Sequence, residues 1–479
     1  MTNTYSPVSP ALLDALRALL GPKGYSDAPL TMAPWLTDWR GRYHGQAAAM
    51  LSPGSTEEVQ AIVRLAGEYG VPLVPQGGNS GMVAGATPDA SGNALLLSLR
   101  RMNHVRTIDP ASNQVTAEAG VILQNLHEAV EAQGRRFPLT LGGKGSATVG
   151  GLVSTNAGGT QVLRHGPMRA LVLGLEAVLP DGSLHNSLAA LKKDNRGYNL
   201  DQLLIGAEGT LGVVTAATLK LVPKIGQRHL VWAATDTPHQ ALATLRALDP
   251  ILGDALEGFE ILPGTALANV VHHIPGTNAP LAPSYPWHIL IEAVASEGSG
   301  GVESKLLESI AALIEKGVLR DAVAAKNERE ADAMWLLRDS ISESERALGP
   351  ALQHDISVPV DRMPDFLIHD TAVLAGEFPG LTLMGFGHLG DGNIHLHAKP
   401  PRDTPDRGAA WIEAHGHAVS EAIYLRVIAA GGSISAEHGI GRAKRDYFLS
   451  LDDPARIAAL RAIKTALDPK GIVNPGALI

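Results

Sequence analysis

The chain has 479 residues, which at roughly 100–200 residues per domain predicts two to four domains or subdomains with an ample core. A net charge of −9, with 4% aromatic and 18% charged residues, argues against both a nucleic-acid-binding surface and a disordered acidic chain. The sequence contains no cysteine, which excludes disulfides, thiolate zinc sites and iron–sulfur clusters, so any redox chemistry must reside in a bound cofactor.

The first half of the chain predicts alternating short strands and helices. Ser55 and Glu58 form a capping-box pattern, apolar residues then recur at helical spacing, and Gly70 follows the last of them, so a helix is predicted over 55–70. Periodicity and turn residues further predict strands at 71–75, 94–99 and 114–120, a helix at 122–134, and a hairpin around the Pro-Asp-Gly turn at 180–182.

Three glycine-rich clusters stand between these elements, at 74–85, 141–159 and 205–215. Of the 52 glycines, 22 lie between Gly70 and Gly212. Exposed backbone N–H groups at such clusters can hold a pyrophosphate without a lysine, although tight turns explain any single cluster equally well. The first cluster is neither a P-loop nor a GxGxxG turn, so it lacks the usual signatures of those two nucleotide-binding folds.

The second half predicts an open sheet covered by longer helices, and it is rich in histidine. Eight of the 18 histidines lie between His354 and His438. If 387–397 forms a turn followed by a strand, alternation places Asn393, His395 and His397 on one face. His388 precedes the turn and can fold back toward His395, which brings together two imidazoles suited to Zn²⁺, Mn²⁺ or Fe²⁺.

The segment 433–446 offers an adjacent carboxylate and imidazole, Glu437 and His438, ahead of two glycines. Such a pair allows one side chain to bind a metal while the other acts as a base. Taken singly, each of these histidines and the glutamate is expected to be structural. Together with His388 and His395 they favour a functional site.

The residues PQGGNSGMVAG, GGLVSTNAGG and DNRGYNLDQLLIGAEGTLGVVT resemble the FAD-contacting segments of the vanillyl-alcohol-oxidase-like (PCMH-type) flavoproteins, in the branch of D-2-hydroxyglutarate, D-lactate and glycolate dehydrogenases. The resemblance implies an α+β chain with a bipartite FAD-binding domain and a central α/β substrate domain with an open antiparallel sheet. The implied bounds are 1–225 (core about 42–223) for the FAD domain, 226–430 for the substrate domain, and 431–479 for a segment that returns to the FAD domain.

The same resemblance implies the residues that contact FAD. Because the first loop has no histidine or cysteine, the FAD is expected to be non-covalent. The implied contacts are Pro75, Gly77, Gly78, Asn79, Ser80, Gly81 and Met82 in the first cluster; Ser146, Gly150, Gly151, Thr155, Asn156, Gly158 and Gly159 in the second; Glu208, Gly212, Val213 and Val214 in the third; and Asn474 near the C-terminus.

For the metal and the base, the resemblance implies His388, His395 and Glu437 as ligands of one divalent ion, Zn²⁺ or alternatively Mn²⁺, and His438 as the base. For the substrate it implies Arg338 as the partner of the carboxylate. Ser342 lies four residues later and is expected on the same helix face.

The chain departs from the family pattern at two positions expected to face the substrate. Gln353 stands where members commonly have lysine, and His397 stands where they often have asparagine. Glutamine supplies no charge, so a second substrate carboxylate is less well compensated. The departures permit a different 2-hydroxy acid, with D-lactate-like or other monocarboxylates as candidates.

The sequence thus predicts an FAD- and metal-dependent D-2-hydroxy-acid dehydrogenase that passes electrons to a quinone, an electron-transfer flavoprotein or a cytochrome. Alternatives are a flavin oxidase using O₂, an alkylglycerone-phosphate-synthase-like enzyme, a metal-dependent hydrolase, and a non-catalytic FAD-binding subunit. Since no apolar run reaches the ~18 residues that span a bilayer, we expect a cytoplasmic protein, at most peripheral to a membrane. A homodimer is expected.

Overall fold

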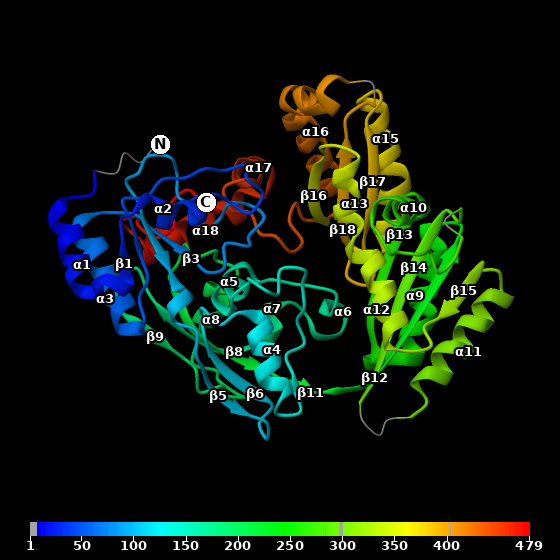
Figure 1. Cartoon of the computed structure of the whole chain (residues 1–479), viewed down its shortest axis with the longest axis horizontal. Coiled ribbons are helices and arrows are strands. Elements are labelled where there is room, and N and C mark those ends of the chain that lie inside the picture. Colours follow the sequence, from blue (N-terminus) through cyan, green and yellow to red (C-terminus); the bar gives the residue numbers. More distant parts are fainter. Residues whose placement is uncertain (1–6, 283, 297–299, 403) are drawn as a thin grey trace. The chain divides into compact units, whose positions relative to one another are not determined.

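The computed structural model describes residues 7–282, 284–296, 300–402 and 404–479. Contacts between Cα atoms divide the chain into two compact units (Figure 1). Unit 1 comprises Met1–Gly159, His165–Pro223 and Glu437–Ile479; unit 2 comprises Thr160–Arg164 and Lys224–Ala436. Residues 160–164 thus belong to unit 2, although the chain before and after them belongs to unit 1. The sequence did not predict this assignment.

Unit 1 begins with a four-stranded sheet in the order β1-β2-β4-β3, in which β2, β4 and β3 run parallel. The bounds are β1 (Tyr25–Ser26), β2 (Ala49–Leu51), β3 (Leu73–Gln76) and β4 (Leu95–Ser98), with helices α1 (Pro10–Gly24), α2 (Pro29–Met32) and α3 (Thr56–Tyr69). As predicted, the Ser55 side chain caps α3 at Glu58 N and Gly70 ends it with φ 65°. The Glu58 carboxylate, however, accepts from Gly54 N at 2.6 Å rather than from the cap residue.

A five-stranded antiparallel sheet completes unit 1, in the order β5-β6-β10-β8-β9. The predicted Pro-Asp-Gly hairpin is confirmed, since β8 pairs with β9. The strands are β5 (Val105–Asp109), β6 (Gln114–Glu118), β8 (Val172–Val178), β9 (Leu184–Asn186) and β10 (Val213–Lys220), with the short pair β7 (Arg135–Arg136) and β11 (Val222–Pro223). The helices are α4 (Leu123–Glu131), α5 (Val149–Thr155), α6 (Val162–His165, which crosses the unit boundary), α7 (Met168–Leu171), α8 (Leu200–Leu204), α17 (Arg445–Leu451) and α18 (Pro454–Leu467).

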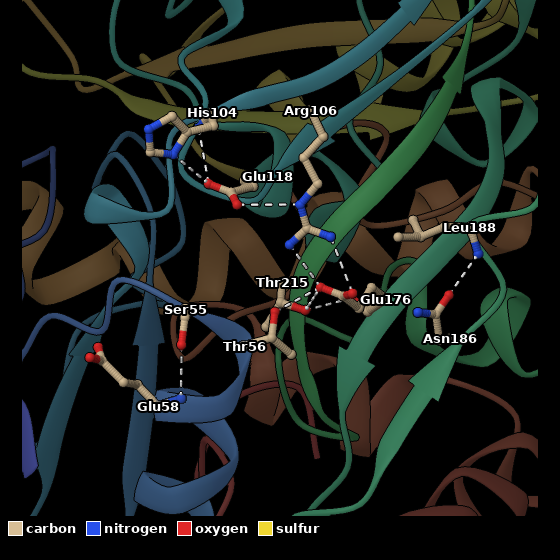
Figure 2. A network of polar contacts seen from close by, with 10 residues as sticks. All are labelled: Ser55, Thr56, Glu58, His104, Arg106, Glu118, Glu176, Asn186, Leu188 and Thr215. Atoms are coloured by element: carbon tan, nitrogen blue, oxygen red, sulfur yellow. Dashed lines mark hydrogen bonds and ion pairs between the residues drawn. The ribbon is translucent and has the colours of Figure 1, made fainter.

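A buried carboxylate ties α3 to this second sheet (Figure 2). Glu176 on β8 accepts hydrogen bonds from the hydroxyls of Thr56, at 2.7 Å, and Thr215, at 2.9 Å. Arg106 on β5 donates to the same carboxylate from Nη2 at 3.0 Å. Burial raises the pKa of Glu176, but these bonds outweigh it and lower the pKa overall. The start of α3 is thus fixed to three strands of the sheet.

Unit 2 is built on a seven-stranded, wholly antiparallel sheet in the order β15-β12-β14-β13-β17-β18-β16. The expected α+β chain with an open antiparallel sheet is therefore confirmed. The strands are β12 (Ile225–Thr235), β13 (Leu256–Pro263), β14 (Trp287–Ser296), β15 (Asp321–Ala324), β16 (Leu352–Ser357), β17 (Thr382–His388) and β18 (Asn393–Lys399). The helices are α9 (Pro238–Leu252), α10 (Gly264–His273), α11 (Val302–Glu315), α12 (Glu328–Asp339), α13 (Ile341–Ala347), α14 (Met363–Asp365), α15 (Thr371–Glu377) and α16 (Ala409–Ala429).

One face of this sheet packs on α10, α12 and α13. Leu230, Trp232, Leu290 and Phe386 from the strands share a buried cluster with side chains of the three helices. These helices therefore fix which side chains can approach that face of the sheet. Among the described residues, no helix combines the length and the apolar character needed to cross a bilayer.

Candidate active site

In unit 1, the first two glycine clusters lie in direct backbone contact. A Cβ built on Gly78 would stand 1.7 Å from the carbonyl oxygen of Ser146, so only glycine allows this approach. Next to it, Thr148 is 2% exposed, and its hydroxyl has no hydrogen-bond partner among the described residues. A buried hydroxyl without a hydrogen-bond partner, between two glycine loops, suits a ligand that carries many hydrogen-bonding groups. FAD, the cofactor predicted from the sequence, is such a ligand.

Several predicted FAD residues instead support their own loops. Asn79 has φ 52° and donates from Nδ2 to Thr37 O at 2.9 Å. Asn156 ends α5 in the left-handed region, and its Oδ1 accepts from Arg169 N at 2.9 Å. Thr155 Oγ1 donates to Gly151 O at 3.0 Å. These side chains shape the loops, and their contacts with FAD stay a prediction.

The remaining predicted FAD residues also lie in unit 1. Pro75 lies in β3, whose end leads into the loop containing Gly77, Gly78, Asn79, Ser80, Gly81 and Met82; Ser146 precedes α5, which contains Gly150, Gly151 and Thr155, and Gly158 and Gly159 follow it; Gly212 precedes β10, which begins with Val213 and Val214.

Glu208 and Asn474 meet in unit 1. The Glu208 carboxylate accepts from the backbone N–H groups of Ile440 and Gly441, each at 2.7 Å. Asn474 donates from Nδ2 to Glu208 O at 2.7 Å. The predicted FAD contact of Glu208 remains a prediction, whereas its contact with the segment after His438 is observed.

In unit 2, the alternation predicted for the histidine strand is confirmed. Ile394 and Leu396 are fully buried, while His395 and His397 pair across the sheet with Asp355 and Gln353 of β16. His388 ends β17, and its ring lies 5.4 Å from the ring of His395, centroid to centroid, at 76°. The predicted approach of the two imidazoles is therefore present.

A buried glutamate holds both His388 and Arg338. Glu260 on β13 pairs with His388 across the sheet, and its Oε1 lies 2.5 Å from His388 Nδ1. Arg338 donates from Nε to Oε2 at 2.7 Å, and its Nη2 lies 3.3 Å from His388 Nε2. Because the carboxylate engages Nδ1, the ring is oriented with Nε2 directed away from Glu260, and Nε2 is the nitrogen that a metal would use.

The charge of Glu260 persists although the side chain is 1% exposed. Burial raises the pKa of this carboxyl, but the positive charges of Arg338 and His388 lower it more strongly, to about 2. Sequence reasoning missed Glu260. The available signal was an acidic residue in the middle of an otherwise apolar strand, GFEIL.

The helix expected to carry both Arg338 and Ser342 is interrupted. Helix α12 ends at Asp339 and α13 begins at Ile341, so Arg338 and Ser342 lie on two helices separated by Ser340, and their shared face stays a prediction. The backbone N–H of Ser340 still donates to Leu336 O at 3.0 Å, as in a helix, but the ψ of Ser340, −1°, departs from the helical value of about −42°. Ser342 is half-buried on the second helix.

Beyond His395 the same face carries a compensated ion pair. Lys399 forms an ion pair with the buried Glu345 of α13, which also accepts from Asn269 Nδ2 at 2.9 Å. His397 Nδ1 lies 3.9 Å from the same carboxylate. Burial raises the pKa of Glu345, but hydrogen bonds from His397 and Lys399 lower it overall, so the carboxylate stays charged and neutralises Lys399.

Glu437 and His438 are the first residues of the last segment of unit 1 and directly follow Ala436 of unit 2. The residues just before Glu437, 433–436, form no strand. Instead, Ser433 makes an isolated bridge with Ser357 at the end of β16, through two backbone hydrogen bonds of 2.8 and 3.0 Å.

Comparison with known proteins identifies the family. A family model described as FAD binding domain matches residues 47–187, and one described as FAD linked oxidases, C-terminal domain, matches residues 227–478. The mitochondrial D-2-hydroxyglutarate dehydrogenase of Bos taurus is 36% identical over 471 residues, covering 98% of this chain and 84% of that protein. The D-2-hydroxyglutarate dehydrogenase of Xanthomonas citri pv. viticola is 35% identical over 453 residues, covering 94% and 93%.

The fold agrees with this relationship. A solved structure of p-cresol methylhydroxylase with substrate bound is 16% identical, with a TM-score of 0.74 over 97% of this chain and 96% of that chain. The expected PCMH-type fold and FAD cofactor are confirmed. The chain therefore belongs to the family of FAD-linked oxidoreductases that includes the D-2-hydroxyglutarate dehydrogenases, and it is an FAD-linked dehydrogenase.

Proposed function

We propose that this protein oxidises a D-2-hydroxy acid to the corresponding 2-oxo acid. The observation that carries the proposal is the buried group of Glu260, Arg338 and His388, with His395 beside it, on one face of the unit 2 sheet. It joins a fixed cation to two imidazoles, which is what binding and activating a hydroxy carboxylate requires. FAD, when bound, supplies the acceptor for the two electrons that leave the substrate α-carbon as hydride to N5.

Arg338 binds the substrate carboxylate in this scheme. Glu260 holds the guanidinium by Nε and so fixes its plane, and the parallel N–H donors of a guanidinium match the two oxygens of a carboxylate. The Arg338 side chain is only 12% exposed, so water competes weakly for such a contact. His438 takes the proton of the substrate hydroxyl as the hydride leaves, which balances the conversion of the alcohol to the ketone.

We propose that His388, His395 and Glu437 hold a divalent metal. The donor set fits one, because Glu260 orients the ring of His388 and the His395 ring lies beside it. Glu437 is proposed as the third ligand, because a carboxylate completes a donor set of two imidazoles. Such a metal, when bound, lowers the pKa of the substrate hydroxyl.

The substrate that these residues favour has one carboxylate and an uncharged distal end. The relatives are named for D-2-hydroxyglutarate, a dicarboxylate. Here Gln353 and His397 pair across the sheet, and the nearby Lys399 is neutralised by Glu345. A second substrate carboxylate would therefore meet no uncompensated cation on this part of the face among the described residues.

The test is the anaerobic visible spectrum of the purified protein during addition of D-lactate, glycolate, D-2-hydroxyglutarate and the L forms. Bleaching of oxidised flavin by a D-2-hydroxy acid is the expected result, with the monocarboxylate faster than the dicarboxylate. Folded, flavin-loaded protein that no 2-hydroxy acid reduces would refute the proposal. Dialysis against a chelator should slow the bleaching while FAD stays bound, and Zn²⁺ or Mn²⁺ should restore it.

A further inference from the structure

Glu208 occupies an unusual backbone position in unit 1. Its φ is 51°, in the left-handed region that a non-glycine residue adopts only at a cost, and it is 8% exposed. Its two carboxylate oxygens are used separately, Oε1 by Ile440 N and Oε2 by Gly441 N, each at 2.7 Å. The backbone of Glu208 is thus strained, and its buried carboxylate accepts from two successive backbone N–H groups. Such a carboxylate fixes the orientation of the peptide planes that it binds.

The segment that it binds is also held on its other side. Val83 O accepts from Arg442 N at 3.0 Å and from Ala443 N at 3.1 Å. The approach is close throughout, since a Cβ on Gly439 would stand 2.8 Å from Glu208 Oε1. Residues 439–443 are therefore clamped between Glu208 and the first glycine cluster.

The clamp is anchored to the sheet by Asn474. Its side-chain nitrogen donates to Glu208 O at 2.7 Å and to Gly85 O at 2.9 Å. Its backbone N donates to Leu73 O, at the start of β3, at 2.7 Å. The position of Glu208 is thus set by a core strand rather than by the segment that it holds.

We propose that Glu208 is a positioning residue that aims His438, which immediately precedes the clamped segment. The inference rests on the proposed role of His438 as base, and it assigns Glu208 a task other than the FAD contact predicted from the sequence. Glutamine has one acceptor oxygen, and its amide N–H₂ would face a backbone N–H, so only a carboxylate satisfies both donors. A misplacement of about 1 Å at a reacting group lowers a rate by about 100-fold.

The test compares Glu208→Gln with Glu176→Gln in the full-length, FAD-loaded protein. Glu176 is a matched control, since it is also a buried glutamate of unit 1, bonded to Thr56, Thr215 and Arg106 (Figure 2). Three quantities are measured: FAD bound per chain, hydrogen exchange of peptides covering 437–444, and the limiting rate and half-saturation of flavin reduction by the best 2-hydroxy acid.

Glu208→Gln should retain FAD, exchange about 10-fold faster over 437–444, and reduce flavin about 10- to 100-fold more slowly, with half-saturation changed by less than about threefold. Glu176→Gln should leave the exchange and both kinetic values within about twofold. If Glu208→Gln does not fold, Glu208→Asp, which keeps two acceptors on a shorter arm, should show smaller changes of the same kind.

Loss of FAD with unchanged exchange over 437–444 would show that Glu208 serves the cofactor, and would overturn the inference. A limiting rate equal to that of the native protein would overturn it as well. If no 2-hydroxy acid reduces the native flavin, the proposed function fails by itself, and equal exchange in Glu208→Gln and native protein would then refute the clamp separately.

Discussion

Two buried glutamates, one in each unit, have pKa values that are shifted in opposite directions. Glu208 and Glu260 each use both carboxylate oxygens as acceptors. The partners of Glu208 are neutral backbone N–H groups, and burial raises its pKa. The partners of Glu260 are Arg338 and His388, whose charges overcome burial and lower its pKa to about 2. The charge of the partners, rather than burial itself, decides the direction of the shift.

The two glutamates fix different parts of the molecule. Around Glu208, hydrogen bonds to the backbone fix the shape of the segment after His438. Around Glu260, bonds from the carboxylate fix the side chains of Arg338 and His388 and orient the imidazole ring. The first arrangement suits the positioning of a base, and the second suits binding of a substrate anion and a cation.

The largest effect should follow from breaking the ionic arrangement. Glu260→Gln removes the buried carboxylate that pairs with Arg338 and leaves the guanidinium its longer ion pair with the exposed Asp339, so we expect a loss of about 3–5 kcal/mol in the free energy of unfolding and no measurable flavin reduction. Urea unfolding with the native protein and Glu208→Gln in parallel measures the difference. Equal destabilisation by the two substitutions would show that the charge of the partners does not matter.

Removal of the proposed base should affect chemistry alone. His438→Ala should keep bound FAD and substrate affinity, while flavin reduction slows by about 10²- to 10⁴-fold. Anaerobic stopped-flow absorbance measures the rate. His415→Ala is the control, because His415 is exposed on α16 and stacks on Trp411. Unimpaired reduction in His438→Ala would refute the assignment of the base.

Adding a cation to unit 2 should change specificity by a smaller amount. Gln353→Lys places a positive charge beside His397, where Lys399 is already neutralised by Glu345. We expect kcat/KM for D-2-hydroxyglutarate relative to D-lactate to rise about 10-fold, equivalent to about 1.4 kcal/mol. Gln353→Glu should shift the ratio the other way. An unchanged ratio in both variants would place Gln353 outside the substrate site.

Local patterns in the sequence predicted the features that depend on neighbouring residues. The Ser55 cap and the shared face of His395 and His397 follow from periods of 3.6 and 2 residues, which any one segment carries by itself. The break at Ser340 was missed because the residues around it are compatible with a continuous helix.

Features that depend on distant pairing were not accessible in this way. Glu260 acquires its role only because β13 pairs with β17, which brings His388 opposite it from 128 positions away in the sequence. Glu208 was assigned to FAD from its motif, whereas its bonds run to residues more than 230 positions later. Sequence patterns report the residue types at such sites, but only the strand register reports their partners.

The smallest effect is the pH dependence of stability, and its sign distinguishes Glu208 from the control Glu176. The pKa of Glu208 is raised in the folded state, because burial outweighs the bonds from Ile440 and Gly441 and the charge of Lys444. Its contribution is therefore fully present below the unfolded-state pKa and declines as pH rises from about 4.5 through the folded-state value. The pKa of Glu176 is lowered, so its contribution is present above the unfolded-state pKa and is lost only as pH falls below it.

Urea unfolding between pH 4.5 and 7.5 measures this difference. As pH rises, the free energy of unfolding of the native protein should lose part of its excess over that of Glu208→Gln, whereas its excess over that of Glu176→Gln should be retained. Parallel behaviour of the two variants would mean that neutral and charged partners hold a buried carboxylate equally well.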